Sequence, residues 1–187
     1  MTAEGLLMFG KKLHTPEYTL AGDEVAVIET SQGTIRVRLD GEGAPIHVAN
    51  FCELSTMGFY DGLKFHRYVP GFVIQGGCPN TRDMTRDEVA RGLEGPDGMP
   101  GTGGPGYCIK AEYLTNPNNS HEDGALAMAR SMNPDSAGSQ FYFCLGAQHN
   151  LDSGYTVFGQ TVEGLDVISE LRAGDVIEHV SIVHKEQ

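Results

Sequence analysis

The chain has 187 residues, 40% of them hydrophobic and 20% charged, so it can bury a core and is not globally disordered. Its 25 acidic and 13 basic residues leave a net charge of −12, which argues against a nucleic-acid-binding or anionic-membrane surface. No apolar run approaches the ~18 residues of a membrane-spanning helix. The first ten residues also lack the basic start of a signal peptide, so we expect a cytoplasmic protein.

Residues 1–22 show no clear period, and we interpret them as an N-terminal extension of one domain that spans residues 23–187. Within residues 34–39, strict alternation puts Ile35, Val37 and Leu39 on one face, as in a half-buried strand. Short apolar or alternating segments predict strands over 25–28, 34–39, 64–69, 73–76, 107–112, 125–129, 141–145, 156–162 and 176–183.

Two helices are expected among these strands. The first begins at Pro45 and ends near Gly58, and the second covers Leu165–Arg172. Residues 78–106 hold seven Gly and four Pro, which predicts a long loop of functional importance. Many short strands with two helices indicate an all-β (mainly β) domain, namely a closed barrel that the helices cap.

Several chemical motifs are absent or out of context. The stretch 101–106 fits G-x-G-x-x-G but lacks the preceding strand and following helix of a dinucleotide site, so no cofactor is expected. The four cysteines include no C-x-x-C pair and predict reduced thiols, with neither a disulfide framework nor a metal site. His121 lies among polar residues and is interpreted as a solvated turn residue.

The most informative run is residues 65–77, where Arg67 lies inside an apolar and aromatic segment. A guanidinium stays charged, so it must either pair with a carboxylate or line a wet cleft. Both alternatives remain open on this segment alone.

Several motifs occur in one order along the chain: F-H-R-x-x-P-G-F-x-x-Q-G-G from Phe65, then G-T-G-G, A-M-A, S-Q-F, L-D and V-F-G. With these motifs the chain resembles the cyclophilin-type peptidyl-prolyl cis-trans isomerases from about Glu24 to Val183. The resemblance implies an eight-stranded antiparallel closed β-barrel capped by two α-helices, with the substrate groove on its outer face. It also implies proline-containing peptides and unfolded or folding proteins as partners, and a monomer.

The resemblance assigns roles to individual residues. Arg67 would donate a hydrogen bond to the prolyl nitrogen as the amide twists, Phe72 would contact the proline ring, and Gln75 would position Arg67. These three are the predicted catalytic residues. The predicted substrate-binding residues are Val73, Met128, Ala129, Arg130, Gln140, Tyr142, Leu151 and Tyr155.

Three positions depart from the family pattern. Tyr142 replaces a phenylalanine; its hydroxyl is tolerable if it points to the groove rim, so we expect a modest change. Asn150 stands where well-studied members carry a tryptophan that contacts cyclosporin, so weakened binding of cyclosporin-like ligands is expected. Cys78 replaces a common aspartate before the long loop.

The alternative to an active isomerase is a proline-peptide-binding or chaperone-like module with little catalysis. The intact set of Arg67, Phe72 and Gln75 favours the enzyme.

Overall fold

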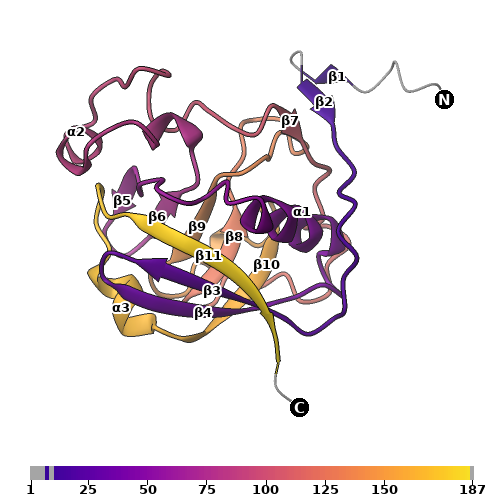
Figure 1. The fold of residues 1–187 in the computed structure, drawn as a ribbon. Helices are drawn as coiled ribbons and strands as arrows, with labels where there is room; N and C mark the ends of the chain where they lie inside the picture. Colours follow the sequence, from indigo (N-terminus) through magenta and orange to yellow (C-terminus); the bar gives the residue numbers. More distant parts are fainter. Residues whose placement is uncertain (1–6, 9–10, 186–187) are drawn as a thin grey trace.

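The computed structural model describes residues 7–8 and 11–185 (Figure 1). Eight strands form one curled antiparallel sheet in the order β11-β3-β4-β10-β8-β9-β6-β5. A second, three-stranded sheet has the order β1-β2-β7. The strands are β1 (Leu7–Met8), β2 (Lys11–Leu13), β3 (Glu24–Thr30), β4 (Gly33–Leu39), β5 (Arg67–Val69), β6 (Val73–Gly76), β7 (Tyr107–Cys108), β8 (Ala125–Met128), β9 (Phe141–Cys144), β10 (Val157–Glu163) and β11 (Ile177–His184).

The large sheet curls into a half-barrel, and hydrogen bonds outside the strand ladders join its two edge strands, β5 and β11. The segment before β5 bonds with the start of β11 and the residues just before it, from Phe65 N to Asp175 O (2.9 Å) and from Ile177 N to Leu63 O (2.8 Å). The mainly β, eight-stranded antiparallel architecture is therefore confirmed. Its closure depends on these segments, whereas the prediction assumed strand pairing all the way round.

Helix α1 (Pro45–Thr56) contacts β10 and β11, and α3 (Leu165–Glu170) contacts β4. Figure 1 shows α1 above the curled sheet and α3 below it, as the two predicted caps. Large apolar side chains fill the space between them, and Phe51, Tyr60 and Phe141 pack with their ring centroids 5.1–5.8 Å apart.

The start of α1 is stabilised by a residue far away in the sequence. Its N-cap, Ala44, has no side chain that accepts a hydrogen bond. Instead, the buried Glu112 carboxylate accepts from Ile46 N (3.1 Å), His47 N (2.8 Å) and His47 Nδ1 (2.7 Å). A carboxylate satisfies the unpaired N–H groups of a helix start and complements the helix dipole.

The Gly- and Pro-rich segment 78–106 is more ordered than a plain loop. It contains a third helix, α2 (Arg86–Ala90), which opens with a capping box between Thr85 and Glu88. Arg86 Nη2 lies 2.7 Å from Asp175 Oδ1, which ties α2 to the turn before β11. The prediction of only two helices was therefore wrong, although the T-x-x-E pattern at 85–88 was a usable signal.

The predicted strand 107–112 shortens to β7, which pairs in parallel with β2 of the N-terminal extension and lies outside the barrel. Residues 11–18 thus lie against the domain. His14 N donates to Cys108 O (2.7 Å), and Tyr18 N donates to Glu53 Oε1 of α1 (2.9 Å).

No helix within the described ranges is long and apolar enough to cross a membrane. The four cysteines are unpaired and buried.

Candidate active site

Strands β8 and β9 are buried on both faces, which sorts their side chains into two sets. Successive residues of a strand point to opposite faces of the sheet. The inner set packs in the barrel core and consists of Leu126, Met128, Phe141 and Phe143. The outer set forms a second apolar cluster under the outer face and includes Ala125, Ala127, Tyr142 and Cys144.

Met128 therefore lies apart from the other predicted substrate-binding residues. Its side chain is 1% exposed and belongs to the barrel core, so it does not line the pocket described below. Its even spacing from Leu126 was a signal for the inner face.

The candidate site is built on a row of residues across four strands. Arg67 of β5 is the register partner of Gln75 on β6, which faces Tyr142 on β9, which in turn faces Ala127 on β8. Directly opposed residues on neighbouring strands have Cβ atoms ~5 Å apart. The register thus places a cation, an amide, an aromatic ring and a methyl group in line on the outer face.

A pocket of about 190 Å³ opens beside this row. The pocket brings together three predicted catalytic residues and six predicted substrate-binding residues. They are Arg67, Phe72, Val73, Gln75, Ala129, Arg130, Tyr142, Leu151 and Tyr155. Its apolar part comes from Phe72, Val73 and Leu151, which belong to the outer cluster.

Arg67 lies at the exposed end of the row. Among the residues that the structure describes, no carboxylate comes within ion-pair distance of its guanidinium. The sequence left two alternatives open, a carboxylate-paired arginine and an arginine in a wet cleft. The structure agrees with the second. None of the nine described lining residues carries a negative charge, so the cationic head is not neutralised locally.

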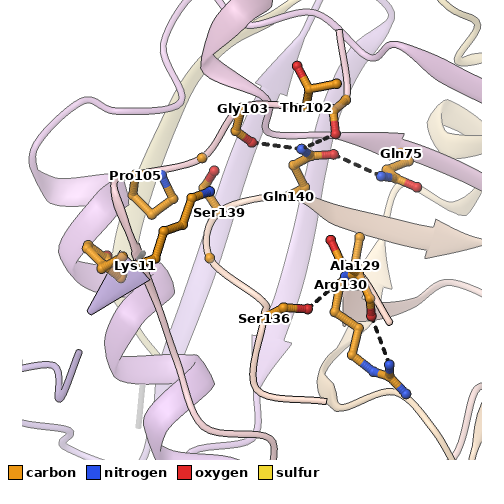
Figure 2. Close-up of a pocket in the computed structure, with 15 residues that line it drawn as sticks. Lys11, Gln75, Thr102, Gly103, Pro105, Ala129, Arg130, Ser136, Ser139 and Gln140 are labelled. Atoms are coloured by element: carbon orange, nitrogen blue, oxygen red, sulfur yellow. Dashed lines mark hydrogen bonds between the residues drawn. The ribbon is translucent and has the colours of Figure 1, made fainter. Parts of the chain in front are cut away.

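Gln75 and Gln140 connect this pocket to the glycine-rich loop. Gln75 Nε2 donates to Gln140 Oε1 (3.0 Å), and Gln140 Nε2 donates to Gly101 O and Gly103 O (both 2.8 Å). Figure 2 shows this chain of bonds. Gln140 therefore lies next to the smaller pocket and lines its larger neighbour. The hydrogen bond described for the Gln75 side chain goes to Gln140 and not to Arg67.

The neighbouring pocket is larger, about 390 Å³, and shares Gln75, Ala129 and Arg130 with the first. Small residues line most of it, from the loop 101–105 and from the segment 136–139. A peptide bound across the outer face would meet both pockets.

The family model for "Cyclophilin type peptidyl-prolyl cis-trans isomerase/CLD" matches residues 25–186. The chain belongs to the cyclophilin-type peptidyl-prolyl cis-trans isomerases. The family and the activity that the motifs indicated are thereby confirmed, and this cyclophilin is an isomerase.

Curated relatives carry the same activity in their names. A peptidyl-prolyl cis-trans isomerase of Synechococcus elongatus is 45% identical over 160 residues, which cover 84% of this chain and 95% of the relative. One of Helicobacter pylori is 40% identical over 172 residues, which cover 91% and 93%.

Solved structures share the fold at lower identity. A crystal structure of a Cryptosporidium parvum cyclophilin type peptidyl-prolyl cis-trans isomerase has a TM-score of 0.70 and 23% identity, and it covers 88% of this chain and 99% of that chain. A second structure of that protein, in the presence of the dipeptide Ala-Pro, has a TM-score of 0.66 and 24% identity, with 87% and 99% covered.

The tyrosine of this cyclophilin that departs from the family pattern is not a rim residue. Tyr142 is 4% exposed, and its hydroxyl lies 2.9 Å from Nε2 of His121, which is fully buried. His121 Nδ1 in turn lies 2.7 Å from Asp152 Oδ1. The Tyr142 hydroxyl thus points inward and not to the groove rim, and the interpretation of His121 as a solvated residue was wrong.

Hydrogen-bonding capacity assigns the protons in this chain. An ionised carboxylate only accepts, so His121 Nδ1 donates to Asp152 and a neutral His121 Nε2 accepts from the Tyr142 hydroxyl. Burial lowers the pKa of His121, which favours the neutral ring. Burial opposes ionisation of Asp152, but hydrogen bonds from His121 and His149 outweigh it and lower the pKa of that carboxyl. Burial raises the pKa of Tyr142, so its hydroxyl stays protonated.

Arg130 and Tyr155 form the opposite wall of the pocket. The Arg130 guanidinium lies over the Tyr155 ring at 4.6 Å from its centroid. Arg130 Nε and Nη2 both donate to Gly154 O (2.8 and 2.6 Å). The cation is thus held against the wall by carbonyl oxygens and an aromatic face, both of which attract it without removing its charge.

One group in the part of the chain described here has ligand atoms close enough together for a metal ion, namely Asp23, Glu24 and His184. It lines neither pocket of the candidate site. The Glu24 carboxylate already accepts from the backbone N–H groups of Ala21 and Gly22.

Proposed function

We propose that this cyclophilin accelerates rotation about X-Pro bonds by donating a hydrogen bond from Arg67 to the prolyl nitrogen of the twisted amide. The observation that carries the proposal is an exposed guanidinium with no carboxylate partner among the described residues, at the edge of a small apolar pocket. Substrates are proline-containing peptides and unfolded or folding proteins, and the family resemblance favours a monomer.

The chemistry explains why a donor is enough. The planar amide has partial double-bond character, and its nitrogen lone pair is delocalised. When the bond twists, the nitrogen becomes pyramidal and regains that lone pair as an acceptor. A donor aimed at the nitrogen therefore stabilises the transition state more than either planar ground state, which is the condition for catalysis.

Free-energy estimates show how much of the rate acceleration Arg67 can supply and how much must come from the rest of the pocket. A 1,000-fold acceleration requires about 4 kcal/mol. A hydrogen bond from a charged group contributes about 1.5–3 kcal/mol, so Arg67 supplies much of this but not all. The remainder is assigned to holding the ring while the preceding carbonyl rotates.

The apolar side chains suit that holding role. Burying the three ring methylenes of proline contributes about 2.4 kcal/mol at ~0.8 kcal/mol each. Phe72, Val73 and Leu151 offer the apolar surface, and the Tyr142 ring is fixed from behind by His121. The twist is then confined to the peptide on the other side of the bond.

The test is cis/trans exchange of a short Ala-Pro peptide by NMR exchange spectroscopy. We expect Arg67→Ala to reduce kcat/KM by about 10- to 150-fold, which corresponds to a lost charged hydrogen bond. Arg67→Lys should fall in between, because a lysine keeps the charge without the planar fork. Arg38→Ala removes an exposed arginine that lines neither pocket and is the matched control.

Equal catalysis by wild type and Arg67→Ala would contradict the proposed mechanism and leave the family assignment intact. The alternative, a binding or chaperone-like module, makes a different prediction. In that case the peptide resonances shift on binding without faster exchange, and affinity for a denatured protein survives Arg67→Ala.

Cyclosporin binding separates this chain from relatives that carry a tryptophan. Asn150 is exposed in the 3-10 helix His149–Leu151, directly before the pocket residue Leu151. We expect weakened binding of cyclosporin, since the side chain lacks a large aromatic surface. A calorimetric titration that gave nanomolar affinity would contradict this prediction.

A further inference from the structure

The larger pocket has an unusual charge for this protein. The chain as a whole carries 25 acidic and 13 basic residues. Of the fifteen described residues that line the larger pocket, none has a carboxylate, whereas Lys11 and Arg130 are cationic. The pocket that holds Arg67 likewise has no acidic lining residue among those described. Although the protein as a whole is acidic, its surface is therefore locally positive at the place where the substrate peptide is proposed to bind.

Lys11 is the cation that reaches into the larger pocket. It belongs to β2, which pairs in parallel with β7 and so lies at the pocket's edge. Its Nζ lies 3.9 Å from where a Cβ on Gly104 would stand. In Figure 2 the Lys11 side chain extends from the strand toward Ser139 and Pro105.

The extension that carries Lys11 is fixed to the domain. His14 lies 3.2 Å from the Glu53 carboxylate of α1, and its ring packs on Tyr107 with centroids 4.2 Å apart. Glu53 also accepts from the backbone N–H groups of Glu17 and Tyr18. These contacts follow Lys11 directly in the chain and hold the segment that carries it against the domain.

Other polar groups of this pocket are already engaged. Gln140 uses its amide on Gly101, Gly103 and Gln75, and the Ser139 hydroxyl donates to Gly77 O (2.8 Å). The Arg130 guanidinium donates to carbonyl oxygens, as described above. Among the described residues, no carboxylate lies within ion-pair distance of the Lys11 ammonium.

We propose that Lys11 makes the larger pocket a subsite for an acidic side chain of the substrate, so that this cyclophilin prefers an Asp or Glu near the proline. The inference rests on the proposed function, because it requires the proline to occupy the smaller pocket. The two pockets share Gln75, Ala129 and Arg130, so one extended peptide fills both. An extended peptide advances about 3.3 Å per residue, so the acidic residue lies within a few positions of the proline.

The expected preference is modest. Ion pairs between exposed side chains contribute about 0.4–1 kcal/mol, which corresponds to a two- to fivefold change in affinity. The preference should also fall with added salt, since the screening length shrinks from about 8 Å at 0.15 M to about 3 Å at 1 M.

The test uses octapeptides with one Ala-Pro unit, in which a single Glu or its neutral isostere Gln is placed in turn at each of the three positions on either side. NMR titration gives the Kd of each peptide for the full chain, and exchange spectroscopy gives kcat/KM. We expect one Glu position to bind two- to fivefold more tightly than the matching Gln peptide. Lys11→Gln should reduce that ratio to about one, Lys11→Glu should invert it, and Lys11→Arg should retain it.

Lys12→Gln is the matched control. It makes the same charge change on the next residue of β2, which points to the opposite face and does not line the pocket. The Glu/Gln ratio should therefore survive in this variant.

Two results would overturn the inference. The first is a Glu/Gln ratio near one at every position, and the second is a ratio that persists in Lys11→Gln or is lost equally in Lys12→Gln. If wild type still isomerises the Gln peptides in either case, the proposed function stands while the subsite fails. If the Gln peptides bind but are not isomerised, the proposed function fails while the Kd ratios still decide the subsite.

Discussion

Removing the Tyr142 hydroxyl tests whether the buried chain behind the pocket stabilises the fold. Tyr142→Phe keeps the ring and deletes the atom that lies 2.9 Å from His121 Nε2. His121 is fully buried, so its Nε2 would lose its partner with no water to replace it. A buried polar group without a partner costs about 1–3 kcal/mol. In a domain of this length that corresponds to a fall in Tm of about 2–12 °C.

The assay is thermal and urea-induced unfolding at pH 7 of Tyr142→Phe, with Tyr155→Phe as a control. Tyr155 borders the same pocket, is only partly buried, and its hydroxyl has no hydrogen bond among the described contacts, so its loss should change the free energy of unfolding by less than ~0.5 kcal/mol. A double-mutant cycle with His121→Ala isolates the pair, and we expect a coupling of about 0.5–1.5 kcal/mol.

A coupling energy near zero, or equal effects of the two tyrosine variants, would refute the reasoning. Either result would mean that the Tyr142 hydroxyl is no better satisfied in the folded chain than in water, and that its ring is positioned by packing alone.

Two further variants and one pH dependence test the fold around the site. Glu112→Gln removes the negative charge that accepts three hydrogen bonds at the start of α1, and urea unfolding should show a loss of about 3 kcal/mol; a loss below 1 kcal/mol would contradict this role. Burial, with a smaller contribution from the Arg67 charge, lowers the pKa of His66 from 6.5 to about 4. The unfolded chain therefore takes up this proton first, and about 3 kcal/mol of stability is lost as pH falls from 6.5 to 4; an NMR titration of His66 near pH 6.5 would disprove it. Gly77→Ala places a Cβ 2.5 Å from Ser139 O at a φ of +89°, so calorimetry should show a larger loss than for Gly71→Ala, where φ is +68° and no atom lies within 4 Å.

The strands were predictable because they depend on local order. Alternation marks the half-buried strand over 34–39. Period two also separates Tyr142 from Phe141 and Phe143, and the structure shows which of these faces is the outer one. The arrangement of the smaller pocket could be expected only from the family resemblance, because Arg67, Gln75 and Tyr142 become neighbours when three short strands pair in register.

Other features depend on contacts that no local pattern encodes. Lys11 reaches the larger pocket because β2 pairs with β7, almost a hundred residues away. His121 has polar neighbours in the sequence, yet it is buried because Asp152 and Tyr142 both bind its ring. Such non-local partners decide the environment of a side chain, whereas sequence context suggests only its average environment.

Along β8, small side chains alternate with large ones, and the small ones point to the outer face of the sheet. On β8 and just after it, the outer positions are Ala125, Ala127 and Ala129, whereas the inner positions are the large Leu126 and Met128. The large side chains fill the barrel, Ala125 and Ala127 are fully buried in the outer cluster, and Ala129 lines the smaller pocket together with Phe72 and Tyr142. The segment A-L-A-M-A thus builds the core and the pocket together, since the same alternation that excludes Met128 from the pocket leaves the space that the proline ring is to occupy.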